Sequence, residues 1–274
     1  MSGISLSCGC RDNSGKASSS ALTCASSRPV VQPGSRRHRL SSLPTPPSQL
    51  IFLPGALGDQ DFWKPLAREA RTEAERVFIA YPGFAGAPAD PSITSLEDLV
   101  SAVASRIHRP AALIAQSMGG VIALELALRK ATLITHLVLV ATSGGLDTSQ
   151  FGAVDWRPIV KQHHPDLPTW FASYHRDLSS ALSGIRIPVL LLWGDRDPLS
   201  PLAVGNALLA RLPHATMHVV PGGEHDLARV HAMSIAPLID AHLQNRRTPG
   251  SLLNTFVSGG DEITPVPGVT PDSA

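Results

Sequence analysis

Between residues 49 and 245 the sequence alternates short apolar runs with longer stretches of mixed polarity. The apolar runs are 49–53, 76–81, 111–116, 136–142, 187–194 and 215–220. A strand that reads as a continuous apolar run is buried on both faces, which is typical of parallel sheets. The pattern therefore predicts a mostly parallel sheet of about six strands.

The intervening stretches have the periodicity of amphipathic helices. In 95–107, "SLEDLVSAVASRI", apolar residues recur at helical spacing, and Glu97 and Asp98 lie in the first turn, where the helix dipole favours them. Further helices are expected over 118–130 and near 201–212 and 225–243. Helices that connect parallel strands cover both faces of the sheet. We therefore expect an α/β fold, a three-layer α/β/α sandwich.

Residues 144–183 interrupt this alternation. They contain no obvious strand but hold five of the thirteen aromatic residues. An insertion at the carboxyl edge of a parallel sheet can cover a ligand crevice, so we interpret this segment as a short lid. The alternative is a helical excursion that packs its aromatic rings into the core. The lid residues expected to contact a substrate are Trp156, Trp170, Phe171 and Tyr174.

Neither end of the chain has helical or strand periodicity. We predict that 1–48, rich in Ser and Arg, and 246–274 are disordered tails around a domain of residues 49–245. The acid-poor N-terminal segment also resembles an organellar transit peptide, and a wrongly chosen translation start is a further alternative. We expect a cytoplasmic protein, with organellar targeting as the second possibility.

The formal net charge of +1 is distributed unevenly. Residues 1–48 carry six Lys and Arg against one Asp, which leaves residues 49–245 mildly acidic. Such a domain lacks the basic surface that nucleic-acid binding requires. The three cysteines, at positions 8, 10 and 24, all precede the domain, and no apolar run reaches the roughly 18 residues that span a bilayer. We expect neither a nucleic-acid partner nor a membrane span.

Three residues of complementary chemistry each follow the end of a predicted strand. They are Ser117, Asp197 and His225. In a parallel sheet these strand ends share one edge, so the three side chains can converge there. A serine hydroxyl becomes an effective nucleophile when a base removes its proton and a third group orients that base. Ser, Asp and His also occur in the chain order of one triad-bearing architecture.

Several of these assignments compete with an alternative. At a strand-to-helix junction, Ser117 can instead be a helix N-cap. Asp195 is a rival acid, otherwise expected to be a loop-capping carboxylate, and Glu125 is expected to be a paired structural carboxylate. No phosphate-binding glycine motif follows a strand, and no cluster of metal ligands occurs. We therefore expect no cofactor and no metal.

Four motifs, in this order, resemble those of α/β-hydrolase-fold enzymes. They are "LPGALGDQDFW" (53–63), "AQSMGG" (115–120), "WGDRDPLSP" (193–201) and "GGEHDL" (222–227). The resemblance covers roughly residues 49–245. It implies Ser117 as nucleophile, His225 as general base and Asp197 as the acid that orients it. The implied oxyanion donors are the backbone N–H groups of Ala56 and Met118, and Leu57 next to them is expected to contact substrate.

The sequence departs from the family pattern at three places. In "AQSMGG", which resembles the nucleophile elbow of the family, Ala115 stands where the first glycine usually is. In "LPGALGDQDFW", which resembles the oxyanion loop, Pro54 stands where that loop usually begins with histidine. Residues 1–48 offer no candidates for the two antiparallel strands with which the fold usually opens. None of these departures removes a catalytic group.

The resemblance implies a cofactor-independent serine hydrolase that cleaves an ester-like bond of a small, partly apolar substrate through an acyl-enzyme. A serine at the elbow, rather than an aspartate, argues against dehalogenase or epoxide hydrolase chemistry. One alternative is a carbon–carbon bond hydrolase or lyase on the same fold. The alternative from another class is a receptor-like binding protein without turnover. A small-molecule substrate is the expected partner. The sequence does not indicate the oligomeric state.

Overall fold

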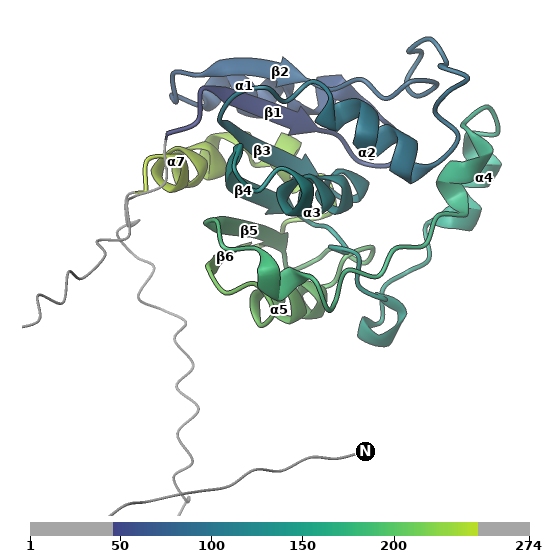
Figure 1. Cartoon of the computed structure of the whole chain (residues 1–274). Helices are drawn as coiled ribbons and strands as arrows, with labels where there is room; N and C mark the ends of the chain where they lie inside the picture. Colours follow the sequence, from purple (N-terminus) through teal and green to yellow (C-terminus); the bar gives the residue numbers. More distant parts are fainter. Residues whose placement is uncertain (1–45, 246–274) are drawn as a thin grey trace, which may run out of the picture. The chain divides into compact units, whose positions relative to one another are not determined.

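The computed structural model describes residues 46–245, shown as coloured ribbon in Figure 1. The predicted tails, 1–48 and 246–274, lie outside the described residues except for 46–48. Six parallel strands form one sheet in the order β2-β1-β3-β4-β5-β6. They are β1 (Gln49–Leu53), β2 (Glu75–Phe78), β3 (Ala111–Gln116), β4 (Ile134–Val140), β5 (Val189–Gly194) and β6 (Ala215–Val220).

This sheet confirms the predicted fold class. Strands β1, β3 and β6 begin and end where the apolar runs predict. Strand β2 ends at Phe78, three residues before the predicted end at Tyr81. Tyr81 is apolar in the sequence pattern because its side chain is buried beneath the loop that follows β1. Tyr81 itself is not part of strand β2.

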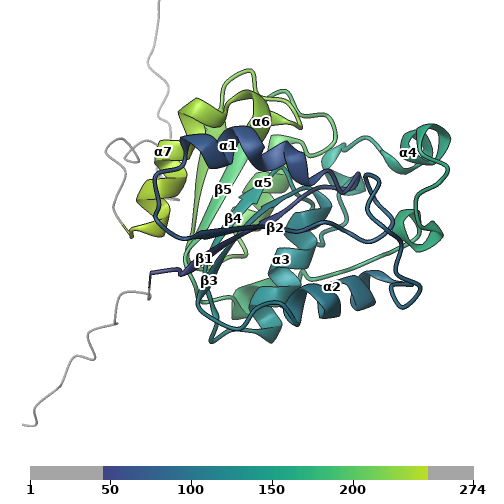
Figure 2. The same cartoon turned by 90° about the horizontal axis from the view of Figure 1, so that it is seen from above.

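Helices cover both faces of the sheet, as Figure 2 shows. The helices α2 (Leu96–Ala104), α3 (Met118–Arg129) and α5 (Leu202–Leu209) pack on one face, and α1 (Lys64–Glu69), α6 (Leu227–Val230) and α7 (Ala232–Leu243) pack on the other. Alternate residues of each central strand enter the two cores: Leu113 and Ala115 of β3 face α3, whereas Ala112 and Ile114 face α7. The predicted three-layer sandwich is therefore confirmed.

Two regions differ in detail from a regular alternation. The helical region expected near 225–243 consists of two helices, because the backbone leaves the helical conformation at His231 (φ −102°, ψ 24°). Residues 144–183 contain no strand, as predicted. They contain α4 (Arg157–His163) and two short 3-10 helices, η2 (Ser149–Phe151) and η3 (Thr169–Ala172), and a third, η4 (Leu182–Gly184), begins at their end.

The strand order reverses direction at β1, which makes β1 and β3 the topological switch point of the sheet. From β1 the chain goes outward to β2 and then returns to the other side of β1 as β3. Ligands of open α/β sheets bind at the carboxyl ends of the strands beside such a point. The loops after β1 and β3 flank it, and these loops carry Ala56 and Ser117. Within residues 46–245 no helix is long and apolar enough to cross a bilayer.

Candidate active site

Ser117 occupies a strained turn between β3 and α3. Its backbone has φ 53° and ψ −120°, and its side chain makes no capping hydrogen bond to α3. A positive φ at a residue with a Cβ costs on the order of 1–3 kcal/mol and persists only where the surroundings impose it. The capping interpretation of Ser117 is therefore wrong, and its partly exposed side chain is available for another role.

The turn requires small residues where β3 and α3 approach their neighbours. A Cβ at Gly119 would lie 2.5 Å from the Pro54 carbonyl oxygen, and a Cβ at Gly120 would lie 2.4 Å from Thr142 Oγ1. Ala115, in contrast, lies fully buried within β3, beside Leu139 of β4. Its methyl group is accommodated there, so the missing first glycine of the motif does not prevent the turn.

A buried carboxylate and an imidazole form an acid–base pair at the ends of β5 and β6. Asp197 Oδ2 lies 2.8 Å from His225 Nδ1. The other oxygen, Oδ1, accepts hydrogen bonds from the backbone N–H groups of Leu199 (2.8 Å) and Ser200 (3.0 Å). Because an ionised carboxylate only accepts, this contact favours the tautomer in which His225 Nδ1 carries the hydrogen and Nε2 a lone pair.

Asp195, the rival acid, has a different partner. Its Oδ1 accepts a hydrogen bond from the Gly222 N–H at 2.6 Å, so it stabilises the loop that carries His225. The two loops also meet backbone to backbone, since a Cβ at Gly194 would lie 2.1 Å from the Gly223 carbonyl oxygen. These contacts match the loop-capping role expected of Asp195 and leave Asp197 as the carboxylate partner of His225.

Gln116, which the sequence did not single out, lies between the three loops of the site. Its Nε2 donates to the His225 carbonyl oxygen at 3.2 Å. A Cβ at Gly55 would lie 2.2 Å from Gln116 Oε1 and 3.2 Å from Ser117 Cβ, so the loop after β1 rests against both residues. No hydrogen bond joins Ser117 Oγ to the His225 ring within the described residues. The sequence signal for Gln116 was a polar residue ending a fully buried strand.

The two expected oxyanion donors lie in the loop after β1, which contains Ala56, and at the start of α3, which begins with Met118. Neither the Ala56 nor the Met118 N–H donates to a protein acceptor in the part of the chain that the structure describes. The Tyr81 hydroxyl donates to the Pro54 carbonyl oxygen at 2.9 Å, and burial raises the pKa of Tyr81 well above 10, so this hydroxyl stays protonated. Tyr81 therefore stabilises the loop at the position where the family histidine is missing.

Thr142, at the end of β4, supports the same turn from the opposite side. Its Oγ1 donates to the Ser117 carbonyl oxygen at 2.6 Å, and its own carbonyl oxygen accepts from Ser200 Oγ at 3.3 Å. Thr142 thus links the serine turn to the loop that carries Asp197. A threonine after an apolar strand gives no sequence signal for such a role.

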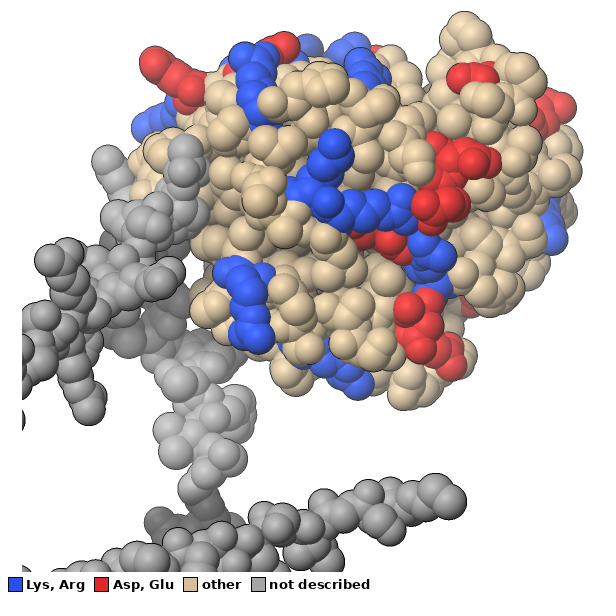
Figure 3. Space-filling model, in the orientation of Figure 1, with Lys and Arg blue, Asp and Glu red and all other residues tan. Residues whose placement is uncertain are grey.

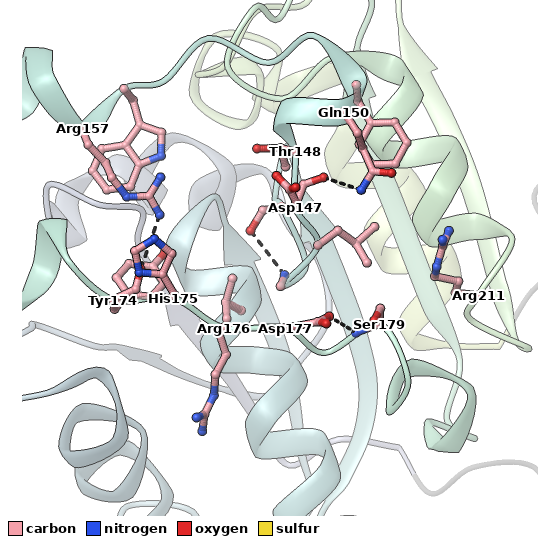
Figure 4. A pocket seen from close by; sticks show the side chains of 16 residues that line it. Asp147, Thr148, Gln150, Arg157, Tyr174, His175, Arg176, Asp177, Ser179 and Arg211 are labelled. Atoms are coloured by element: carbon pink, nitrogen blue, oxygen red, sulfur yellow. Dashed lines mark hydrogen bonds between the residues drawn. The ribbon is translucent and has the colours of Figure 1, made fainter.

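The aromatic residues of 144–183, the predicted lid, are divided between the core and a pocket. Phe171 is buried, with its ring centroid 5.4 Å from Phe84 and 5.1 Å from Trp156. Trp170 packs edge-on against Phe84. Trp156 and Tyr174 line a pocket of about 600 Å³, which we call the lid pocket (Figure 4). The alternative of aromatic rings packed into the core therefore holds for Phe171.

The predicted catalytic residues do not line this pocket. Neither the lid pocket nor a second one of about 260 Å³, which Phe171 lines, includes Ser117, Asp197 or His225. Leu57, expected to contact substrate, is 43% exposed in the loop after β1. Its substrate contact stays a prediction.

Glu125 is a paired carboxylate, as expected. It accepts a hydrogen bond from Arg129 at 2.9 Å and another from Arg176, and both guanidinium groups also bind Glu97. Figure 3 shows basic and acidic side chains interspersed on the visible face of the domain. No group of three or more His, Cys, Asp or Glu side chains within residues 46–245 is placed to hold a metal ion.

Comparison with curated proteins identifies four partial relatives, two of which are as follows. The chain is 41% identical over 91 residues to "Thioesterase TesA" of Mycobacterium marinum. This match covers 31% of this chain and 36% of that protein. It is 37% identical over 79 residues to a poly(3-hydroxyalkanoate) depolymerase of Ectopseudomonas oleovorans, covering 29% of this chain and 28% of that protein. The matched segments thus span about a third of the length of these relatives.

Solved structures with the same fold cover more of the chain. An esterase from Exiguobacterium antarcticum superposes with a TM-score of 0.60 at 15% identity, covering 72% of this chain and 92% of that one. A meta-cleavage product hydrolase from Pseudomonas fluorescens IP01 superposes with a TM-score of 0.58 at 15% identity, covering 72% and 91%. The model of the alpha/beta hydrolase family matches residues 50–234. The chain therefore belongs to the alpha/beta hydrolase family.

Proposed function

We propose that this protein is a serine hydrolase that cleaves an ester or thioester bond through an acyl-enzyme. The observation that carries the proposal is the pair formed by Asp197 and His225, 2.8 Å apart, at the sheet edge where Ser117 holds a strained, non-capping backbone conformation. A structural serine at this junction has no need of that backbone strain. A nucleophile does, because the turn presents its hydroxyl at the end of the sheet.

In the proposed reaction Ser117 Oγ attacks the carbonyl carbon of the substrate. His225 Nε2 takes the serine proton, and Asp197 stabilises the imidazolium that forms. The imidazolium then gives its proton to the departing alcohol or thiol as the bond to the acyl carbon breaks. A water molecule, deprotonated by His225, hydrolyses the acyl-enzyme and regenerates the serine hydroxyl.

The negative charge that develops on the carbonyl oxygen is stabilised by the N–H groups of Ala56 and Met118. Met118 is the first residue of α3, so the positive end of the helix dipole adds to this stabilisation. One such donor typically supplies roughly 3–4 kcal/mol of transition-state stabilisation. Both donors are backbone groups, so their positions depend on Tyr81 and on Gly119, which keep the loop after β1 close to α3.

The names of the two relatives support an ester or thioester as the bond that is cleaved. One is named a thioesterase and the other a depolymerase of a poly(3-hydroxyalkanoate), which is a polyester. Both names describe transfer of an acyl group from sulfur or oxygen to water. The meta-cleavage product hydrolase shares only the fold, at 15% identity, and therefore gives no comparable support to carbon–carbon cleavage.

Covalent labelling tests the nucleophile. We expect a fluorophosphonate probe to label the wild-type protein and peptide mapping to place the label on Ser117. Ser117→Ala should remain unlabelled, whereas Ser101→Ala, which removes an exposed serine of α2, should label like the wild type. An unlabelled wild type favours the receptor-like alternative, and labelling of Ser117→Ala contradicts the nucleophile assignment.

Turnover tests the bond class. We expect hydrolysis within a series of 4-nitrophenyl esters of increasing acyl length and of the matching acyl thioesters, with activity lost in Ser117→Ala. A protein that is labelled at Ser117 but hydrolyses none of these substrates contradicts the ester and thioester assignment and favours carbon–carbon cleavage.

A further inference from the structure

The lid pocket begins close to the proposed nucleophile. Val121, Ser143 and Arg211 form its domain side, and residues of the segment 144–183 form the rest. Val121 lies four residues after Ser117 in α3, about 6 Å along the helix axis. Ser143 follows Thr142, whose hydroxyl contacts the Ser117 backbone. The volume of about 600 Å³ is within the range of small-molecule sites.

Arg157 lies against two aromatic rings at the side of this pocket formed by residues 144–183. Its guanidinium carbon lies 4.9 Å from the ring centroid of Trp156 and 5.8 Å from that of Tyr174. Figure 4 shows Arg157 close to Tyr174 and His175 and across the pocket from Asp147. Stacking on aromatic rings restricts the orientation of a guanidinium plane and leaves its edge for hydrogen bonding.

The hydrogen-bonding capacity of Arg157 is largely unused. Its Nε is buried and has no hydrogen-bond partner among the described residues. Its Nη2 reaches the Tyr174 carbonyl oxygen at 3.5 Å, and its Nη1 lies 3.6 Å from the exposed carboxylate of Asp155. A guanidinium has five N–H donors, and a buried donor without an acceptor is destabilising.

The other charged groups around the pocket are already engaged. Asp147 and Asp177 each accept the backbone N–H two residues further along the chain. Arg176 is paired with Glu125, and in Figure 4 its guanidinium points away from Arg157. Arg211 donates to a carbonyl oxygen of the preceding helical turn. Among the charged side chains that line the pocket, Arg157 is the one with a buried nitrogen that has no hydrogen-bond partner within the described residues.

We propose that the lid pocket binds a carboxylate carried by the substrate, remote from the scissile bond, through the guanidinium of Arg157. The inference rests on the proposed function and narrows it to esters or thioesters whose acyl part ends in a carboxylate. A carboxylate matches the fork of N–H donors of arginine and supplies the acceptor that Nε lacks. Burial raises the pKa of Tyr174 to about 12, so the ring beside Arg157 carries no competing negative charge.

Paired substrates test the specificity. Mono-4-nitrophenyl glutarate carries a terminal carboxylate, and 4-nitrophenyl pentanoate is its neutral counterpart of the same acyl length. We expect the wild type to have the higher kcat/KM on the glutarate ester. Arg157→Met should reduce this preference about 10- to 100-fold, mainly through KM. Arg211→Met, which removes a guanidinium at another part of the same pocket, should retain it. An equal loss of preference in Arg211→Met overturns the assignment to Arg157.

Direct binding separates this inference from the proposed function. The variant Ser117→Ala, with Arg157 intact, is titrated calorimetrically with glutarate and with neutral glutaramide, and we expect only glutarate to bind. Glutarate binding without turnover of either ester supports the pocket assignment and contradicts the hydrolase. Turnover of both esters without preference for the glutarate ester overturns the pocket assignment and leaves the hydrolase intact. Absence of glutarate binding overturns the pocket assignment in every case.

Discussion

Ser117 and its contacts illustrate how single residues maintain a costly backbone conformation. The Ser117 N–H donates to the Val140 carbonyl oxygen at 3.0 Å, and its own carbonyl oxygen accepts from Thr142. Gly119 allows the Leu53 and Pro54 carbonyls to approach closely from the other side. The strained φ is therefore imposed by two neighbouring strands, and it depends on small side chains at positions 119 and 120.

Substitution of the two aspartates after β5 should have different effects on kcat. We expect Asp197→Asn to lower kcat by roughly 1,000- to 10,000-fold, because the amide favours the wrong tautomer of His225 and cannot stabilise its positive charge. Asp195→Asn should lower kcat less than about tenfold, because it retains an oxygen that can accept from Gly222. Steady-state kinetics on one hydrolysed ester checks both variants. The reverse ranking means that Asp195 is the acid.

Tyr81→Phe removes the hydroxyl that binds the Pro54 carbonyl oxygen but keeps the buried ring against Phe84. A neutral hydrogen bond of this kind contributes about 0.5–1.5 kcal/mol. If it positions the oxyanion loop, kcat should fall about 2- to 10-fold with KM little changed. The control measurement is thermal unfolding, since a loss of activity only in proportion to unfolded protein indicates a purely structural role.

At the scale of elements, an ion-pair network attaches the end of the lid segment to two helices. Arg176 of the lid segment and Arg129 of α3 each bind both Glu97 of α2 and Glu125 of α3. The Glu125 side chain is only 8% exposed, whereas that of Glu97 is 53% exposed. Glu125 therefore contributes more of the attachment, because water screens the pairs made by Glu97.

Glu125→Gln should loosen the lid and lower the free energy of unfolding by about 1–2 kcal/mol, since one buried carboxylate no longer neutralises two guanidinium groups. Urea unfolding measures the stability, and faster amide hydrogen exchange around Arg176 should report the loosened lid. Asp61→Asn breaks the exposed ion pair with Lys64 and should change the stability by less than about 0.5 kcal/mol. Equal effects of the two variants would contradict a specific role of Glu125.

At the scale of the whole domain, α7 is joined to the sheet through two histidines. The rings of His136 in β4 and His242 in α7 lie 5.3 Å apart at 82°. His242 Nε2 lies 3.0 Å from the Leu137 carbonyl oxygen. Burial, together with the neighbouring His136, lowers the pKa of His242 from 6.5 to about 4, and burial also lowers the pKa of His136. Both rings are therefore neutral in the folded protein at neutral pH.

This pairing makes folding stability depend on pH. The folded state resists protonation of His242, whereas the unfolded state takes up a proton near pH 6.5. The stabilisation is therefore complete above pH 6.5 and is lost as the pH falls toward 4, by on the order of 3 kcal/mol for a shift of this size.

Urea unfolding at pH 7.5, 6 and 5 measures this dependence. His242→Gln, which keeps a donor for Leu137, should flatten it. His218→Gln, which changes an exposed histidine of β6, should leave it as in the wild type. A pH dependence that survives in His242→Gln would assign it to other groups.

Much of the fold was predictable because the central strands are buried on both faces. The apolar runs of β1, β3 and β5 end where the strands end, whereas β4 ends at Val140, two residues before the end of its predicted run. The helices between the strands imply the parallel order. The end of β2 was not predictable, because an apolar run does not distinguish a strand residue from a buried loop residue. The break between α6 and α7 at His231 was not predictable either, because helical periodicity continues across it.

The candidate site was predictable only in part. Ser117, Asp197 and His225 stand out because they follow strands and occur in a motif order, and their catalytic roles stay predictions. Gln116, Tyr81 and Thr142 were missed. Their partners lie 25 to 109 residues away in the chain, and no local pattern indicates such contacts.

The family, the parallel sheet and the three positions at its carboxyl edge follow from the amino-acid sequence, because periodicity and motif order are local properties of the chain. Contacts between distant segments are needed to show that the Ser117 side chain does not cap α3 and that Asp195 contacts Gly222 while Asp197 contacts His225. They also show that Arg157 lines a pocket with a buried Nε that has no hydrogen-bond partner within residues 46–245. A local pattern cannot indicate these contacts, because hydrogen-bond partners and burial depend on which distant segments the fold brings within about 3 Å of one another.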